Sequence, residues 1–553
     1  MEYGNYGYTD EMTGAGWRTR RPGMHEEVPR RHWHQNDPGV VPNLLQTGAG
    51  SPAGITFYTG TLLPDAFHNQ LLHAEALQNV IRAYPARRAG AGYAAEMVDL
   101  LKSRDPWFRP SDVATAPDGS VFVADWYDPG VGGNKMDDIQ RGRIYRLAPD
   151  VASYEVPAFD LSTPEGAVSA LHNPNMDVFY QAWHRLRDWG VEAEAALLAS
   201  WRSDDPHQAA RALWLLARLP GKTQQYIGEA LRHPEPELRI TGLRVARQLD
   251  AANLLDYLAP AVRDQDPGVR REAAVALRHD GSERASRLWA DLAARYDGAD
   301  RWYLEALGIG ADLHAAARFA AWKHQVGDDW NTPAGRHLIW RLRAEPTIDL
   351  LTQIIRDPQV DPDWLPRYFR AFHFKPGKGR DAALAALVDI EHPLAAQIRV
   401  LALGQIGADY VRRNAAFRAQ VRRILPEIAG TPEWLTAIRS MQLREQAPQL
   451  LDYFLHGDDP GLADEAGHLL LEFNGVNLLL QHLQGLDELE QKAVYAQLGR
   501  VQHPDAVGLL VRQLEQPALS FPVQVQLVES LGNSWDGQHF LYDKLRAGEL
   551  TGD

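Results

Sequence analysis

Residues 205–213 read DPHQAARAL, and close variants return as EPELRITGL at 235–243 and as DPGVRREAA at 266–274. The prolines of these stretches are spaced by 30 and 31 residues (236 − 206 and 267 − 236). A proline fits the first turn of a helix, where its missing N–H costs nothing, and the acidic residue before it can cap that helix. Helix pairs that recur at such a period cannot bury their apolar faces alone, so they stack on their neighbours. The three stretches therefore predict a solenoid of HEAT-type repeats.

The repeat signal continues toward the C-terminus in weaker form. Residues 392–403 read HPLAAQIRVLAL, and residues 503–510 read HPDAVGLL. At this spacing the chain holds on the order of ten repeats. We expect an all-α, HEAT-like solenoid over residues 161–553, joined to the N-terminal part by a linker at 151–160.

The first 150 residues have a different character, because they contain 17 of the 45 glycines and several short β-prone runs. Strands are predicted at 54–58, 79–84, 95–100 and 142–147. The clearest unit joins 111–116 to 121–125 through Pro117-Asp118-Gly119. Asp-Gly between two β-prone runs is a strong hairpin signal.

A strand, a tight turn, a second strand and then an outer strand are typical of one blade of a β-propeller. Residues 51–150 suffice for only about two blades, whereas a propeller closes with roughly four to eight. Two blades alone would leave sheet edges unpaired. The predicted fold class is therefore a multidomain β + α chain: the last blades of a propeller over 1–150, followed by the α-solenoid. Either another chain completes the propeller, or earlier blades precede these residues in a longer protein.

The bulk composition limits the function classes. The formal net charge is −15, which argues against nucleic acid as a partner, because affinity there comes from neutralising phosphates. No stretch approaches the roughly 20 apolar residues that a transmembrane helix needs. The chain has no cysteine, which excludes disulfides and covalent haem attachment through CxxCH within it. Its first residues lack the features of a signal peptide, so a literal interpretation would leave it in the cytoplasm.

Several motifs in the first 150 residues resemble known proteins. Residues 51–60 (SPAGITFYTG), 109–113 (RPSDV) with the turn at 117–119, and 142–147 (GRIYRL) look like the closing blades of quinoprotein glucose/sorbosone-type dehydrogenases.

Two longer strings give a closer resemblance. Residues 31–45 (RHWHQNDPGVVPNLL) and 124–133 (ADWYDPGVGG) resemble the PVC-type haem-binding CxxCH proteins, also called putative membrane-bound dehydrogenases. In that family a signal peptide precedes the propeller, HEAT repeats follow it and a c-type cytochrome domain ends the chain. The resemblance implies that this chain is a fragment lacking the N-terminal blades and the cytochrome domain.

The function implied by the resemblance is that of an extracytoplasmic, periplasmic oxidoreductase. The intact parent would oxidise a sugar or polyol at the propeller and pass electrons to haem c in the domain absent here. The solenoid would serve as a spacer or as a docking surface for a protein partner. This chain alone would be inactive as an enzyme.

The cofactors implied by the resemblance are pyrroloquinoline quinone (PQQ) or Ca²⁺ at the propeller. The sugar dehydrogenases carry an Arg-x-Arg-Asp pattern in the last blade, with the arginines facing the quinone carboxylates. Arg109 matches the first arginine, but Ser111 stands at the second, and this departure weakens the case for PQQ.

The candidate catalytic residues are His32, His34 and Asp37. In an extended segment the two histidines point the same way, so both imidazoles could face one substrate or metal ion, with His25 as a further nitrogen ligand. Two histidines without a defined third ligand are a weak metal signal, and no metal site is predicted. The alternative is a polar loop packed over the propeller mouth.

The candidate cofactor-binding residues are Arg109, Asp125, Trp126 and Asp128. The last three lie where a predicted strand leaves the sheet, so their carboxylates could bind Ca²⁺ or sugar hydroxyls, and Trp126 could stack on a sugar ring. The alternative is an Asp-capped structural turn with a packing tryptophan. In the solenoid, Trp183, Trp189, Trp201 and Trp214 are interpreted as core packing.

Two other function classes stay open. In the first, the chain is a non-enzymatic scaffold whose blades and solenoid bind a protein or a glycan, which the serine at position 111 favours. In the second, Asp125 and Asp128 act as the carboxylate pair of a carbohydrate hydrolase or lyase, which depends on a separation that the sequence does not give.

Overall fold

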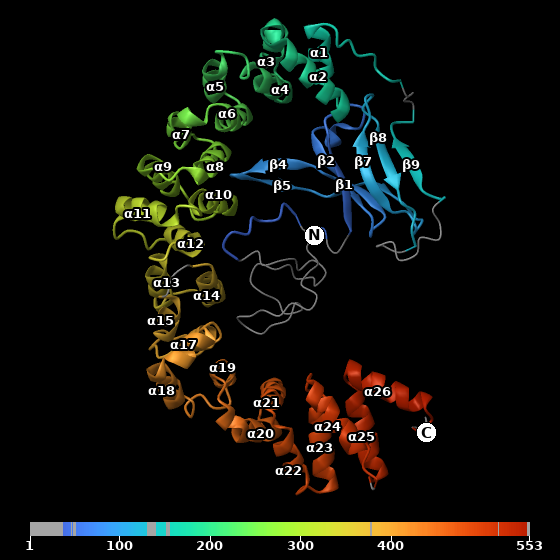
Figure 1. Cartoon of the computed structure of the whole chain (residues 1–553), viewed down its shortest axis with the longest axis vertical. Helices are drawn as coiled ribbons and strands as arrows, with labels where there is room; N and C mark the ends of the chain where they lie inside the picture. The colour runs from blue at the N-terminus through green and yellow to red at the C-terminus, as the bar shows by residue number, and fades with distance from the viewer. Residues whose placement is uncertain are drawn as a thin grey trace. The chain divides into compact units, whose positions relative to one another are not determined.

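The computed structural model describes residues 37–45, 47, 51–129, 140–150, 155–375, 379–517 and 519–549. The described residues form two compact units. The first unit runs from residue 37 to 354 and also takes in 370–375, and the second comprises 355–369 and 379–549. A small antiparallel β region comes first in the chain, and a long all-α region follows it (Figure 1).

The β region begins with a four-stranded antiparallel sheet in the order β1-β2-β3-β6. The strands are β1 (Pro52–Tyr58), β2 (Gln70–Glu75), β3 (Val80–Tyr84) and β6 (Val98–Lys102). Three of them were predicted, although the expected strand at 95–100 is shifted to 98–102. Strand β2 was missed because its sequence, QLLHAE, lacks β-branched residues and does not alternate regularly.

A second antiparallel sheet has the order β7-β8-β9, with β7 (Pro110–Thr115), β8 (Val121–Asp125) and β9 (Arg143–Leu147). The predicted hairpin is confirmed: Thr115 pairs with Val121, and Gly119 takes a φ of 85° in the turn. Glycine is favoured there because it has no Cβ to clash in the left-handed region.

The two sheets share one hydrophobic core. Leu72 and Ile81 of the first sheet are fully buried against Val121 and Val123 of the second. Tyr58 joins them with a hydrogen bond, because its hydroxyl donates to the Gly119 carbonyl at 2.8 Å and accepts from Leu63 N at 2.9 Å. The described strands do not close into a ring; they form these two sheets and a separate two-stranded hairpin.

The hairpin consists of β4 (Ala86–Ala89) and β5 (Gly92–Ala95), and Figure 1 shows it extending from the sheets toward α8 and α10. The backbone N–H of Ala91 donates to the Asp300 carboxylate at 2.6 Å, and Arg88 pairs with Asp266 at 2.6 Å. The sequence prediction did not include this hairpin.

Helices fill the rest of the first unit. Helices α1 to α12 belong to it, and α13 and α14 contribute residues to both units. Their bounds are α1 Pro164–Leu171, α2 Met176–Trp189, α3 Glu194–Trp201, α4 Pro206–Leu216, α5 Thr223–Leu231, α6 Pro236–Leu249, α7 Leu254–Ala261, α8 Pro267–Ala276, α9 Glu283–Ala293, α10 Arg301–Ala311, α11 Ala315–Val326, α12 Pro333–Arg341, α13 Thr347–Ile355 and α14 Leu365–Ala371.

The repeat prediction is confirmed at the helix starts of α4, α6 and α8. Each begins at its proline, and the acidic residue before it caps the helix: Asp205 accepts from His207 N, Glu235 from Glu237 N, and Asp266 from Gly268 N. Such a cap is worth about 1 kcal/mol, so the pattern fixes where these helices begin.

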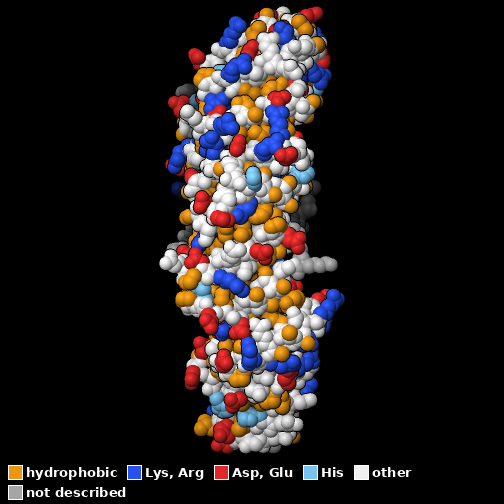
Figure 2. Space-filling model, turned by 90° about the vertical axis from the view of Figure 1, so that its left-hand side faces the viewer, with side chains coloured by type: hydrophobic (Ala, Val, Ile, Leu, Met, Phe, Trp, Pro, Cys, Tyr) orange, Lys and Arg blue, Asp and Glu red, His pale blue; other side chains and the backbone are white. Residues whose placement is uncertain are grey.

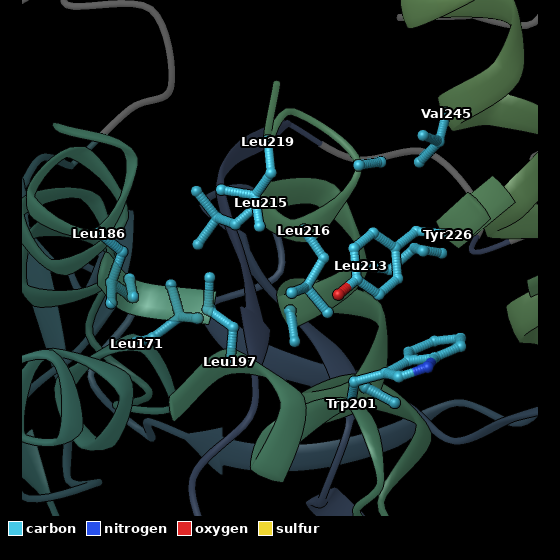
Figure 3. Packing of buried hydrophobic residues seen from close by; sticks show 14 of the residues in the cluster. Leu171, Leu186, Leu197, Trp201, Leu213, Leu215, Leu216, Leu219, Tyr226 and Val245 are labelled. Carbon is cyan, nitrogen blue, oxygen red and sulfur yellow. The ribbon is translucent and has the colours of Figure 1, made fainter. Parts of the chain in front are cut away.

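The first helices pack around one apolar cluster (Figure 3). Leu171 of α1, Leu197 of α3 and Leu213 of α4 are almost completely buried in it, together with Tyr226 of α5. Full burial of one such leucine stabilises the fold by about 2 kcal/mol. Trp201 lies in this core as predicted, whereas Trp183, Trp189 and Trp214 are only half-buried at its edge.

The second unit is helical throughout its described residues. Its helices are α15 Arg380–Ala385, α16 Ala395–Leu403, α17 Ala408–Arg413, α18 Ala415–Ile424, α19 Pro432–Met441, α20 Ala447–His456, α21 Pro460–Glu472, α22 Val476–Leu483, α23 Glu488–Leu498, α24 Pro504–Leu514, α25 Phe521–Gly532 and α26 Trp535–Arg546. The predicted start at Pro504 is confirmed, while the helix expected at Pro393 begins later, at Ala395. Basic and acidic side chains are interspersed on the helical face in Figure 2. Among the described helices, none is long and apolar enough to cross a membrane.

Candidate functional site

Two adjoining pockets in the first unit lie between the β region and helices α2 and α4. One is mainly polar, with a volume of about 310 Å³, and the other is mainly apolar, with a volume of about 470 Å³. They share Thr59, His207 and Arg211. We call them together the aromatic groove. Both volumes fall in the range of small-molecule sites, roughly 300–1,000 Å³.

Aromatic rings form the wall of the apolar pocket. Phe179 and Trp183 come from α2, Trp214 from α4 and Phe57 from β1. Phe179 and Trp183 are four residues apart, so they share one face of α2. The rings on α2 and α4 are half-buried and rest on the apolar cluster of Figure 3, which leaves part of each ring accessible.

Two arginines of the α4 region lie among these rings. The Arg211 guanidinium stacks over Phe179 at 4.9 Å, and that of Arg218 lies 5.7 Å from the Trp183 centroid and 5.9 Å from that of Trp214. Nη1 of Arg211 donates to the Leu171 carbonyl at 2.8 Å, which fixes its side chain. Such cation–π contacts contribute about 0.5–1 kcal/mol at exposed sites and more where water is excluded.

The polar pocket contains His172 and His207. Nε2 of His172 lies 2.8 Å from the Ser200 hydroxyl, and the imidazole of His207 is 3.4 Å from the Asp205 carboxylate. Burial, assisted by the positive charge of Arg211, lowers the pKa of His172 to about 4. His172 is therefore neutral at pH 7.

Hydrogen bonds between the β region and the first helices hold the groove together. Asn173 donates to the Pro117 carbonyl at 3.0 Å, and Asn175 donates to the Thr115 carbonyl at 2.8 Å. The carboxamide of Asn175 also caps α2. The β7–β8 turn and the start of α2 are thus fixed to each other, and they hold the two walls of the groove in place.

The structure brings together the four residues predicted to bind a cofactor. Arg109 lies just before β7, and its guanidinium donates to the carbonyls of Asp128 at 3.0 Å, Ala76 at 3.1 Å and Pro129 at 3.4 Å. Three of its five N–H groups are therefore used on the backbone. In this arrangement Arg109 clamps a loop, and its predicted role as a ligand for quinone carboxylates stays a prediction.

The carboxylates of this loop also have structural partners. Asp125 accepts through Oδ1 from the backbone N–H groups of Arg109 at 2.8 Å and Tyr127 at 2.9 Å, which supports the left-handed φ of 50° at Tyr127. Trp126 donates from Nε1 to Asp128 at 3.1 Å, and the residue is 54% exposed. Oδ2 of Asp125 is buried and has no hydrogen-bond partner in the part of the chain that the structure describes.

Among the candidate catalytic residues, His32 and His34 lie outside the described residues. Asp37 is buried and forms a bidentate ion pair with Arg370 at 2.9 and 3.0 Å. The carbonyl of Asp37 accepts from Arg301 at 3.2 Å. These contacts anchor residue 37 to α10 and α14, and its predicted catalytic role stays a prediction. Among the residues that the structure describes, no group of three or more His, Cys, Asp or Glu side chains could hold a metal ion.

Sequence reasoning missed the aromatic groove. The four aromatic residues come from segments far apart in the chain, so no local motif joins them. A signal was present in the helices, where Arg211, Trp214 and Arg218 recur at helical spacing, but Trp183 and Trp214 were interpreted as core packing.

The fold and the groove define a chain in which a β region and the first helices line two adjoining ligand-sized pockets. A family model described as a domain of unknown function, DUF7133, matches residues 24–150, which include the β region. No curated protein matches the chain.

Solved structures give distant similarities. A chain of a homology model of the full-length AP-3 complex in an intermediate open conformation has 13% identity and a TM-score of 0.28, covering 70% of this chain and 83% of that one. A crystal structure of an engineered protein has 14% identity and a TM-score of 0.24, covering 67% of this chain and 98% of that one.

Proposed function

We propose that the first unit is a carbohydrate-binding module without catalytic activity of its own, and that its binding site is the aromatic groove. The observation that carries this proposal is the pairing of an apolar pocket walled by Trp183 and Trp214 with an adjoining polar pocket. Ligand sites are mostly apolar, with a few polar groups that fix orientation.

A sugar matches this division. One face of a pyranose ring presents C–H groups, which pack against an aromatic ring, while its hydroxyl groups require hydrogen-bond partners at the rim. Trp183 and Trp214 offer partly accessible rings, and Gln208, His207 and Asp205 line the polar side. These residues can supply hydrogen-bond partners for the sugar hydroxyls. Each hydroxyl buried without a partner would weaken binding by about 1–3 kcal/mol.

Calorimetric titration of the full chain tests the proposal. The ligands are soluble hexasaccharides: cellohexaose, xylohexaose, mannohexaose and hexagalacturonate. We expect at least one of them to bind, and we expect Trp214→Ala to weaken that binding at least about tenfold, because truncating an aromatic contact commonly costs more than 1 kcal/mol.

Trp189→Ala provides the matched control. Trp189 is also a half-buried tryptophan at the edge of the same apolar cluster, but it does not line either pocket. Its replacement should leave the affinity unchanged. Equal losses in the two variants would point to an effect on folding, and the absence of binding by any oligosaccharide would refute the proposal.

We further propose that the sheets β1-β2-β3-β6 and β7-β8-β9 are successive blades of a β-propeller and that the helices form a HEAT-type array. The shared core of the two sheets and the Pro-capped helix starts support this. The flanking DNA tests the propeller part. Coding sequence for further antiparallel blades upstream is expected, and an in-frame stop directly upstream would contradict it unless a partner chain supplies the blades.

As a second candidate function, we propose that the parent protein belongs to the extracytoplasmic sugar or polyol dehydrogenases, with haem c in a separate domain. The resemblance of residues 31–45 and 124–133 supports it, together with the gathering of Asp125, Trp126 and Asp128 on one loop. A dye-linked oxidation assay of the parent with added PQQ and Ca²⁺ tests this class. Turnover of a sugar would support it, and complete inactivity of a protein that binds the same sugar would leave only the binding module.

A further inference from the structure

The charges in the aromatic groove carry an inference about its ligand. The apolar pocket contains the guanidinium groups of Arg211 and Arg218, and none of the described residues that line it is an Asp or Glu. This contrasts with the chain as a whole, whose formal net charge is −15. A half-buried cation without a counter-ion is costly, so the pocket has an electrostatic preference for an anion.

Of the two arginines, Arg218 is the one whose positive charge is less neutralised by its surroundings. It forms no salt bridge with any described carboxylate, and its buried Nε has no hydrogen-bond partner among the described residues either. Its guanidinium lies near the π-systems of Trp183 and Trp214, at 5.7 and 5.9 Å from the two ring centroids. Several other half-buried arginines of the first unit have carboxylate partners, as in the pair between Arg239 and Asp264 at 2.8 Å, while Arg270 and Arg271 donate to backbone carbonyls.

The acidic groups of the adjoining polar pocket have other partners. Asp118 pairs with Arg146 at 2.9 Å and accepts from Ser120. Asp205 caps α4 and lies 3.4 Å from the imidazole of His207. These two carboxylates therefore do little to neutralise the positive charge of Arg218. The negative charge of Asp205 does favour the charged form of Arg211.

We propose, on the basis of the proposed carbohydrate function, that the aromatic groove selects acidic sugars. The sugar ring stacks on the tryptophans while a carboxylate or sulfate oxygen accepts charge-assisted hydrogen bonds from Arg218. Arginine suits both groups, because its planar N–H fork matches paired oxygens.

Titration calorimetry with matched ligands tests the charge requirement. Hexagalacturonate is compared with its fully methyl-esterified form, and a sulfated galactan hexasaccharide with its desulfated form. We expect at least one acidic ligand to bind about tenfold more tightly than its neutral twin. The pair with the larger difference in affinity shows whether the acidic group that the groove recognises is a carboxylate or a sulfate. Raising the salt concentration should weaken the binding.

Two variants test whether Arg218 is responsible for the preference for acidic ligands. Arg218→Gln should abolish the preference for the acidic twin, whereas Arg185→Gln should not, since Arg185 stacks on Trp189 at 4.5 Å outside the groove. If Arg218→Gln does not fold, Gln248→Glu replaces it: Gln248 is exposed at the same pocket, and a new negative charge should weaken acidic ligands about threefold.

The outcomes separate the two proposals. Equal affinity for acidic and neutral twins, with loss in Trp214→Ala, would overturn the charge selectivity and leave the carbohydrate-binding function intact. Failure of every oligosaccharide to bind would overturn both.

Discussion

Arg88 in the β4–β5 hairpin donates from Nη2 to the carboxylate of Asp266 at 2.6 Å, and the same carboxylate caps helix α8. Nη1 of Arg88 also lies 3.3 Å from Glu237 in the first turn of α6. A side chain of the β region thus contacts the starts of two successive repeat helices. One of the two carboxylates that fix the hairpin, Asp266, is also an acidic cap position that makes the repeats recognisable in the sequence.

Arg88→Ala should loosen this attachment without unfolding the unit. The guanidinium is 31% exposed, so solvent screens the pair, and we expect the free energy of unfolding to fall by about 1 kcal/mol or less. Hydrogen exchange at residues 86–95 should rise. Arg87→Ala is the control, because Arg87 is exposed and forms no salt bridge with the described residues. Unchanged exchange in Arg88→Ala would show that the ion pairs do not hold the hairpin.

Gly92→Ala should displace the hairpin more strongly. A Cβ at position 92 would lie 2.2 Å from Cγ of Trp302 in α10, so either the strand or the ring must move. We expect a loss of about 1–3 kcal/mol in the free energy of unfolding. Adding Trp302→Leu should recover part of it. At Gly508 in α24 a Cβ would meet nothing within 4 Å, and Gly508→Ala should stabilise by up to about 1 kcal/mol.

Asp37→Asn should lower the free energy of unfolding by roughly 3 kcal/mol, because the half-buried Arg370 would lose its bidentate carboxylate partner. Denaturant titration measures the loss, and hydrogen exchange at residues 37–45 reports whether this segment detaches. The control is Asp188→Asn in the exposed pair with Arg187, which should change stability by less than about 1 kcal/mol. Similar small effects in both variants would argue against Asp37 as an anchor.

The stability of the first unit should depend on pH through His172. Its pKa in the folded state is lowered to about 4 by burial, with a further contribution from Arg211, whereas in the unfolded chain it lies near 6.5. Between these values the unfolded state binds more protons, so the contribution of His172 is fully present above pH 6.5 and is lost as the pH falls toward 4.

Nuclear magnetic resonance of the His172 ring carbon should give a titration midpoint near 4. Replacing His172 with Gln should flatten the pH dependence of unfolding between pH 4 and 6.5. A midpoint near 6.5 would show that the imidazole is accessible to water and would contradict its buried position.

The sequence predicted the local features of this fold well. The starts of α4, α6 and α8 follow from an acidic cap and a proline, and the β7–β8 turn follows from Asp118-Gly119. The sequence did not predict β2 or the β4–β5 hairpin. Strand β2 lacks β-branched residues, and the hairpin is held by contacts with distant helices.

The candidate site shows the same division. The sequence named Arg109 and Asp125 as candidate cofactor-binding residues, and the structure joins the Arg109 backbone N–H to the Asp125 carboxylate at 2.8 Å. It could not show that the Arg109 guanidinium donates to backbone carbonyls, one of them at Ala76, since that contact depends on how the first sheet packs beside the second.

The sequence by itself determined where helices begin and where the β7–β8 strands turn, because these choices are made by hydrogen bonds between residues two to five positions apart. Only the tertiary structure decided that Phe57 and Trp214 would line one pocket together with Arg218. That arrangement depends on which partly buried faces meet once the two sheets and the first helices have each formed their cores. Those contacts join residues more than a hundred positions apart, and no local pattern encodes them.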